Sequence, residues 1–412
     1  MDPIRNPYAP GAGQRPPELA GRDDELAAFD VLLERISARR PERSLMLTGL
    51  RGVGKTVLLN QLRSAAIARG FGTGKWEARP DQDIRRPLAG ALHLAIREIA
   101  PRHRAPDRVE HLLAVLKAFG SRQPPGTPMR DRWAPGIDGP AAVGRADSGD
   151  LEIDLVELLT DAAELAGDVG SGIALFVDEV HDLGPDDVSA LCAACHELAQ
   201  LGAPLIVVGA GLPHVPAVLS AAKSYSERLF RFSRIDRLDR TSADLALRAP
   251  ADREGVDFES AALDALYAAA DGYPYFVQAY GKVTWDVAGA SPITAADVAV
   301  ARPIAEAELA VGFFGSRYER ATPAEREYLR AMADADPDSD GPRDGRGTVN
   351  DADHATGTGV STAQVAKSLS RKPASLSPAR DALIKKGLIY SAQRGQIAFT
   401  VPHFGRYLRL QT

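Results

Sequence analysis

A glycine-rich loop between two apolar segments is the feature that most constrains this 412-residue chain. The loop lies within residues 45–59, which read LMLTGLRGVGKTVLL. Glycines allow backbone N–H groups to turn toward phosphate oxygens without a clashing Cβ. The spacing G-x-x-x-x-G-K-[ST] is met at Gly49, Gly52, Gly54, Lys55 and Thr56. With a strand-like run before it and helical spacing after it, the loop predicts a nucleoside triphosphate site.

The roles in such a loop follow from its chemistry. Lys55 is expected to reach the β- and γ-phosphates and so to act in catalysis, while the Thr56 hydroxyl is expected to bind Mg²⁺. The helix that follows adds the partial positive charge of its N-terminus. The predicted cofactors are ATP or ADP and Mg²⁺. The predicted nucleotide contacts are Gly49, Leu50, Arg51, Gly52, Val53, Gly54, Lys55, Thr56 and Val57.

Two adjacent acids follow the buried-strand pattern GIALFVDEVHDL. Asp178 is expected to hold Mg²⁺ at the carboxyl end of that strand, where ligands gather in open α/β sheets. Glu179 is placed to polarise an attacking water as a general base. Alternating strands and helices predict a parallel sheet covered on both faces. We expect an additional-strand P-loop fold, with one strand between the loop strand and the Asp-Glu strand.

Composition narrows the class of protein. An apolar content of 45% and a charged content of 25% are typical of a soluble globular chain. No apolar run reaches the length of a membrane span, and the N-terminus does not read as a signal peptide. We therefore expect a cytoplasmic protein without a membrane partner.

The two cysteines, Cys192 and Cys195, form C-x-x-C-H with His196. This spacing is formally that of covalent haem attachment. Because it lies in an amphipathic helix and nothing directs export, we predict helix-packing cysteines and no haem.

Three domains are predicted along the chain. Residues 1–240 form the ATPase core, with an irregular insertion at 121–150 that holds five prolines and five glycines. Residues 241–315 read as a helical lid. Residues 316–412 form a third domain, interrupted at 334–357 by an acidic segment with too few apolar residues to order itself.

The third domain has the pattern of a winged helix-turn-helix. Thr322 and Glu325 predict a capping box at its first helix, and Ser361 and Gln364 predict another at its second. A third helix of about residues 375–386 precedes two short strands around Arg394-Gly395.

Charge favours nucleic acid as the partner of this domain. Residues 361–412 hold nine Lys or Arg and one acid, a net charge of +8, whereas the whole chain carries −6. A basic module on an acidic body is the electrostatic footprint of DNA binding. The alternative is a module that packs on the ATPase without binding DNA. The predicted contacts with double-stranded DNA are Arg371, Lys372, Ser375, Arg380 and Arg394.

With these residues in place, the chain resembles AAA+/STAND-type P-loop ATPases of the bacterial "ATP-binding protein, AAA family" group. It is also similar to archaeal origin-binding initiators. The resemblance runs from Asn6 to the C-terminus apart from the two irregular segments. The stretch LAGRDDEL matches the motif before the loop, which implies that Gly21, Arg22 and Glu25 lie near the adenine.

The resemblance implies two further sites. The stretch DGYPYF resembles the lid motif of STAND proteins, which implies that Gly272 and Pro274 lie close to the nucleotide. Arg228 occupies the place of an arginine finger that acts on a neighbouring subunit, which implies a homo-oligomer.

Two departures from the family pattern matter. Gly209, Ala210 and Gly211 offer no polar sensor side chain, and GYPYFVQ lacks the usual second-sensor arginine. We therefore expect slow hydrolysis and an ATP-controlled switch of the winged helix. The alternative is a STAND-like signalling ATPase whose winged helix serves autoinhibition or a protein partner.

Overall fold

A computed structural model describes residues 1–11, 13–121, 137, 140–335, 359–393, 395–401 and 403–411. The chain forms two compact units. The sheet unit comprises Arg22–Thr48 and Lys55–Arg234, and the helical unit comprises Met1–Gly21, Gly49–Gly54 and Ile235–Thr412. The change from one unit to the other at Arg234 falls near the predicted boundary at 240. The division of the remainder into lid and third domain stays a prediction, as the two pack within one unit.

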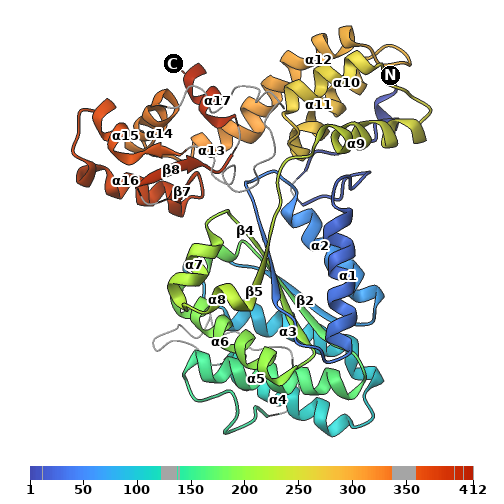
Figure 1. The fold of residues 1–412 in the computed structure, drawn as a ribbon, viewed down its shortest axis with the longest axis vertical. Helices are drawn as coiled ribbons and strands as arrows, with labels where there is room; N and C mark the ends of the chain where they lie inside the picture. Colours follow the sequence, from blue (N-terminus) through green and yellow to red (C-terminus); the bar gives the residue numbers. More distant parts are fainter. Residues whose placement is uncertain are drawn as a thin grey trace. The chain divides into compact units, whose positions relative to one another are not determined.

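The sheet unit is built on five parallel strands in the order β2-β3-β4-β1-β5 (Figure 1). The strand β4 therefore lies between the strand that leads into the glycine loop and the strand that ends in Asp178, as predicted. The strands are β1 (Ser44–Thr48), β2 (Gly72–Glu77), β3 (Ile173–Asp178), β4 (Leu205–Gly211) and β5 (Phe230–Arg234).

The helices of this unit cover both faces of the sheet (Figure 1). Alternating side chains of β3 show the two faces, since Leu175 joins the core under α3, α5 and α6 while Phe176 meets Phe29 of α1 at 6.4 Å. The helices are α1 (Asp23–Ser37), α2 (Lys55–Ala68), α3 (Arg85–Ile99), α4 (Pro106–Ser121), α5 (Leu151–Asp168), α6 (Pro185–Leu201), α7 (Val215–Ala222) and α8 (Ser226–Leu229).

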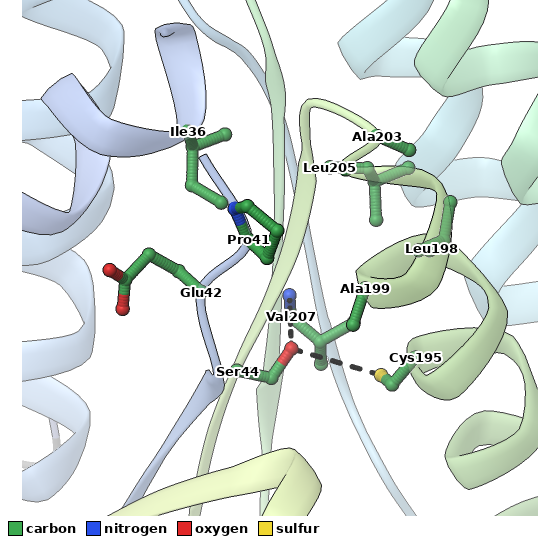
Figure 2. A pocket seen from close by; sticks show the side chains of 11 residues that line it. Ile36, Pro41, Glu42, Ser44, Cys195, Leu198, Ala199, Ala203, Leu205 and Val207 are labelled. Atoms are coloured by element: carbon green, nitrogen blue, oxygen red, sulfur yellow. Dashed lines mark hydrogen bonds between the residues drawn. The ribbon is translucent and has the colours of Figure 1, made fainter. Parts of the chain in front are cut away.

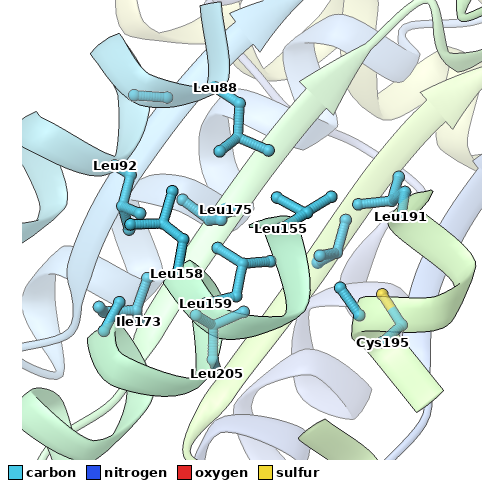
Figure 3. Close-up of a cluster of buried hydrophobic side chains, with 14 of the residues drawn as sticks. Leu88, Leu92, Leu155, Leu158, Leu159, Ile173, Leu175, Leu191, Cys195 and Leu205 are labelled. Carbon is cyan, nitrogen blue, oxygen red and sulfur yellow. The ribbon is translucent and has the colours of Figure 1, made fainter. Parts of the chain in front are cut away.

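The core of the sheet unit is aliphatic (Figure 3). Leu158 and Leu159 of α5 project between the sheet and the neighbouring helices, and both are fully buried. Full burial of a leucine stabilises the fold by about 1.5–3 kcal/mol. The continuous apolar run of β3 is thus explained by burial on both faces, which is typical of parallel strands.

The helical unit begins with helices that follow the sheet. They are α9 (Arg240–Arg253), α10 (Ser260–Ala270), α11 (Pro274–Val287) and α12 (Ala295–Glu308). A π-helix, η5 (Leu309–Gly315), and α13 (Ser316–Tyr318) continue α12. These elements agree with the helices predicted for residues 241–315.

Among the described residues, the end of the helical unit contains four helices and a small antiparallel sheet. The sheet order is β6-β8-β7. Its elements are α14 (Pro323–Ala335), β6 (Val360–Ser361), α15 (Thr362–Ser368), α16 (Pro373–Lys385), β7 (Ile389–Gln393), β8 (Gln396–Phe399) and α17 (Phe404–Leu410). The predicted helices and the predicted hairpin are all present, and α17 is an element that the sequence did not predict.

One of the two predicted capping boxes is confirmed. The Glu325 carboxylate accepts the Thr322 N–H at 2.8 Å, and the Thr322 hydroxyl accepts the Glu325 N–H at 3.4 Å. The second box is wrong in part. Ser361 caps α15 by accepting the Ala363 N–H, but the Gln364 amide donates to the Ala335 carbonyl at 3.4 Å. This tertiary partner takes the place of the local one.

Most of the two irregular segments predicted at 121–150 and 334–357 lies outside the described residues. Within the described residues, no helix is both long enough and apolar enough to cross a membrane.

Candidate nucleotide site

The glycine loop connects β1 to the start of α2. Gly52 and Gly54 have φ angles of +88° and +89°, a region that favours glycine. Lys55 begins α2 and is only 8% exposed, and the first turn of that helix holds no acid. A helix N-terminus without a competing carboxylate is suited to an anion. The loop therefore fits a phosphate group on its own geometry.

The carboxyl end of the sheet brings the loop strand and the acidic strand to one edge. Thr48 of β1 pairs with Gly211 of β4, and Val177 of β3 pairs with Gly209. Asp178, the last residue of β3, is buried at 6% exposure at this edge. Among the described residues no three His, Cys, Asp or Glu side chains are grouped to hold a metal. Mg²⁺ at Thr56 and Asp178 would thus depend on phosphate and water oxygens, its usual partners.

Asp178 has a cationic neighbour that sequence reasoning missed. The Lys75 ammonium on β2 lies 3.9 Å from Asp178 Oδ2 and donates to Asn60 Oδ1 on α2 at 2.6 Å. Burial lowers the pKa of Lys75, and the Asp178 carboxylate opposes that shift. A lysine in the middle of an otherwise buried strand was the available signal, since it needs a partner.

Glu179 occupies a strained backbone position directly after β3. Its φ of +52° is left-handed, and it directly precedes the short 3₁₀-helix η4 (Val180–Asp182) without a capping hydrogen bond from its side chain. Its carboxylate Oε2 lies 3.6 Å from Nδ1 of His181. Residues held in this region are rare and cluster at functional sites. The predicted general base therefore sits in a backbone conformation with an energetic cost.

The helical unit contains the loop residues Gly49–Gly54, and α11 begins against them. The Tyr275 N–H donates to the Gly52 carbonyl at 3.3 Å, and the Tyr275 ring stacks on Phe313 of η5 at 4.6 Å. Pro274 is the first residue of α11, directly before Tyr275. The predicted lid motif is therefore next to the loop, although the contact is made by Tyr275.

Arg51 of the same loop forms a hydrogen bond with the C-terminal part of the chain. Its backbone N–H donates to the Thr400 carbonyl at 2.9 Å. Burial lowers the pKa of Arg317 on α13, and the charge of Arg51 lowers it further. Neither contact was predicted, because no local pattern links residues so distant in sequence.

The remaining candidates from the resemblance are spread over both units. Arg22 is buried and precedes α1, whereas Gly21 is grouped with the helical unit and Glu25 lies in the first turn of α1. Arg228 is exposed on α8, before β5, whose first residue pairs with Ser44 at the amino end of β1. Arg228 thus lies at the sheet edge opposite Asp178, so it does not join the site of its own chain.

Three of the predicted DNA contacts lie at the start of α16. Arg371, Lys372 and Ser375 are exposed there, while Arg371 forms a surface ion pair with Glu327 at 3.2 Å. Arg380 pairs with its neighbour Asp381 at 2.9 Å. Arg394 lies outside the described residues.

The two cysteines are buried on α6, as predicted for packing residues. Burial raises the pKa of both thiols to about 12. Cys195 lines a small pocket at the amino ends of β1 and β4, where the Ser44 hydroxyl donates to its Sγ at 3.8 Å (Figure 2). This pocket is at the sheet edge opposite Asp178, so it is separate from the candidate nucleotide site.

Comparisons with known proteins agree with the sheet geometry. Residues 18–208 match the family model of the AAA ATPase domain, and residues 311–408 match a domain of unknown function (DUF8462). No curated protein matches the chain. The part of the chain spanning residues 18–208 is thus a P-loop ATPase domain of the AAA type.

Solved structures resemble the chain to different degrees. The Walker-type ATPase PABY2304 of Pyrococcus abyssi has a TM-score of 0.55 and 14% identity, over 96% of this chain and 97% of that one. The RuvB Holliday junction branch migration motor of Thermotoga maritima has a TM-score of 0.44 and 16% identity, over 97% and 100%. The Aeropyrum pernix ORC1 protein in complex with DNA has a TM-score of 0.44 and 14% identity, over 99% and 96%. The TM-score of the Pyrococcus abyssi protein exceeds 0.5, so that protein and this chain share the overall fold.

Proposed function

We propose that this protein is a slowly hydrolysing ATP switch whose nucleotide state controls a C-terminal winged helix that binds double-stranded DNA. The observation that carries the proposal is the pair of backbone hydrogen bonds made by the glycine loop. Gly52 accepts from Tyr275 of α11, and Arg51 donates to Thr400 after β8. A phosphate that moves this loop must therefore disturb contacts with both the lid and the last domain.

At the site, each residue has a defined task. Lys55 and the loop N–H groups hold the phosphates, and Thr56 with Asp178 holds Mg²⁺. The metal, when bound, neutralises charge on the β- and γ-phosphates. Glu179 orients the attacking water and accepts its proton. A polar side chain is absent from Gly209, Ala210 and Gly211 at the end of β4, which favours slow turnover.

The order of elements supports a winged helix. Three helices, α14, α15 and α16, are followed by the β7–β8 hairpin, and β6 pairs with β8. In helix-turn-helix proteins the last helix presents its N-terminal residues to the DNA. Lys372 and Ser375 are exposed at that end of α16. The ion pair of Arg371 with Glu327 is half exposed, so it contributes little and can be exchanged for a phosphate contact.

An aromatic cluster favours a second function. The predicted lid and the last domain both contribute rings to it. The ring centroids of Phe276 on α11 and His403 are 5.5 Å apart, and those of Phe314 on η5 and Tyr407 on α17 are 5.3 Å apart. Such packing suits a STAND-like switch in which the winged helix is an autoinhibitory or protein-binding module. A homo-oligomer completed by the exposed Arg228 is compatible with both functions.

A titration of duplex DNA separates the two functions. The protein would be titrated with and without ATP at two salt concentrations, beside Lys55→Ala, which removes the main phosphate contact. Neutralised phosphates release counterions, so the salt dependence of the binding constant reports the number of phosphate contacts. Lys372→Glu should weaken binding and lower that slope by about one. Arg302→Glu on α12, with the same change of charge, is the matched control and should leave binding unchanged.

The outcomes are distinct. Duplex binding that responds to ATP in the unaltered protein but not in Lys55→Ala supports the DNA switch. Absence of duplex binding at the lower salt concentration would reject it in favour of the STAND-like function. Equal weakening by Arg302→Glu would mean that overall charge, rather than α16, attracts the DNA.

A further inference from the structure

The helix α16 has an exposed face of unusual composition for a helix that meets DNA. After its first residue, the exposed positions of this helix are Ala374, Ser375, Pro378, Asp381 and Lys385. Leu376 and Leu383 are buried on the opposite face. Pro378 lies at the middle of the exposed face, and a proline has neither a backbone N–H nor a polar side chain. The centre of the face therefore offers no hydrogen bond to a base.

The polar side chains at the first half of this face have partners within the same segment. The Ser375 hydroxyl donates to the Lys372 carbonyl at 2.8 Å. Asp381 Oδ1 accepts from Nε and Nη2 of Arg380 at 3.0 Å and 2.9 Å. Arg380, the one arginine of α16, lies about 160° around the helix from Pro378, given 100° per residue. Its guanidinium is therefore directed to a neighbouring acid rather than to the exposed face.

Reading of a base sequence requires a different set of side chains. In the major groove, arginine or lysine forms paired hydrogen bonds with guanine, and asparagine or glutamine does so with adenine. Over residues 373–385, all of which the structure describes, the exposed face holds no arginine, asparagine or glutamine. The N-terminal residues that a helix-turn-helix presents to DNA are here Ala374 and Ser375, and a serine discriminates poorly because it can contact any base.

The exposed cations lie instead directly before the helix. Arg371 and Lys372 are both exposed, and Lys372 is the N-cap residue of α16. Contacts with phosphates set the position of a protein on the duplex but carry no sequence information. We infer that this module binds duplex DNA by its phosphates, through the N-terminal end of α16, without reading the base sequence. The inference rests on the proposed function of the winged helix as a DNA-binding module, and it names duplex DNA of any sequence as the ligand.

The first test measures sequence preference with the full-length protein and ATP. Dissociation constants would be determined for a panel of duplexes of equal length and different sequence, and a pool of randomised duplexes would be selected and sequenced. The constants should lie within about threefold of one another, because phosphate contacts are independent of sequence, and no motif should be enriched. In a sequence-specific complex one wrong base pair weakens binding by about 5- to 150-fold. An enriched motif, or differences beyond about tenfold, would overturn the inference.

The second test compares two lysines at the two ends of α16. Lys372→Ala should weaken binding by the same factor on every duplex and lower the salt slope by about one. Lys385→Ala has the same change of charge and is the matched control. It lies about 20 Å further along the helix, which exceeds the screening length at physiological salt, so affinity should change by less than about twofold. Equal weakening by the two substitutions, or unequal weakening by Lys372→Ala across the panel, would overturn the inference.

Asp381→Asn tests the exposed face without removing a cation. A carboxylate in the major groove accepts from cytosine, so its loss would change the ratio of affinities for GC-rich and AT-rich duplexes. We expect this ratio to stay constant, and a changed ratio would show that the face reads bases.

These outcomes separate the inference from the proposed function. Absence of binding to every duplex at the lower salt concentration would reject the proposed function, and the inference would fall with it. Strong preference for one sequence would keep the proposed function and reject the inference alone.

Discussion

The interiors of the two units are packed with different kinds of side chain. The sheet unit has an aliphatic core in which leucines of α5 and α6 fill the space over parallel strands. The helical unit instead has rings in mutual contact, from Phe276 through Phe313 and Phe314 to Phe404. The aliphatic core holds the parallel strands in place, and with them the side chains at the carboxyl ends of those strands. The aromatic packing joins helices of the predicted lid to α17, and the predicted lid and last domain lie within one compact unit.

We propose that ATP hydrolysis takes place in the sheet unit. The substitution Glu179→Gln tests this proposal and has the largest expected effect. Loss of a general base lowers turnover by about 10²- to 10⁴-fold. Binding of ATP should persist because the glycine loop is unchanged. Single-turnover hydrolysis and calorimetry measure the two quantities. Glu164→Gln, an exposed glutamate on α5, is the matched control. Undiminished turnover in Glu179→Gln would remove this residue as the base.

The aromatic cluster can be weakened without touching the sheet. Phe314→Ala removes a ring that contacts Phe404 and Tyr407, and should destabilise the helical unit by about 3–5 kcal/mol. Hydrogen exchange should quicken in α11 and α17 while β3 and α5 keep their protection. Faster exchange in all four elements would contradict two separately stabilised units.

The reverse experiment uses the aliphatic core. Leu158 is fully buried, and Leu158→Ala should cost about 2–5 kcal/mol, with the spread set by how well the cavity closes. Amide hydrogen exchange should become faster in α5 and β3, whereas α17 should stay protected from exchange. Leu201→Ala, at an exposed leucine at the end of α6, is the control and should change exchange little. Faster exchange in α17 before α5 and β3 in Leu158→Ala would contradict separate stabilisation of the two units.

A smaller effect concerns a buried acid of the sheet unit. Burial, with the Asp83 charge, raises the pKa of Asp187 to about 6 from a usual value of 3.8. Because the folded state favours the protonated acid, this residue's contribution to stability is fully present below about pH 4 and is lost as the pH rises through about 6. Asp187→Asn should therefore flatten the stability of the sheet unit across this range, measured by denaturant unfolding at pH 4, 5, 6 and 7. An unaltered pH dependence would contradict the raised pKa.

Much of the sheet unit was predictable from local patterns. Asp178 could be placed at a strand end because the apolar run of residues 173–177 precedes it, and the one strand expected between the loop strand and the Asp-Glu strand is β4. The loop, the capping box at Thr322 and Glu325, and the helices of the last domain were likewise confirmed. Each of these depends on neighbours within a few residues, whose spacing sets the hydrogen bonds.

Other features could not be predicted because their partners are distant in sequence. Gln364 was expected to complete a local capping box, but it donates to Ala335 instead. The contact of Lys75 with Asp178 could not be predicted, because only the pairing of β2 with β3 brings the two residues together. No periodicity encodes contacts of this kind, since they depend on which elements lie side by side.

Local sequence patterns predicted where the glycine loop begins, which strand ends in acids, and which stretches become helices, because these features follow from residue size, backbone freedom and apolar spacing. Only the tertiary structure decided that Thr400 meets Arg51, that rings of η5 and α17 pack together, and that His181 fills the space over Gly211. The physical reason is that local propensities act over a few residues, whereas burial selects partners from the whole chain.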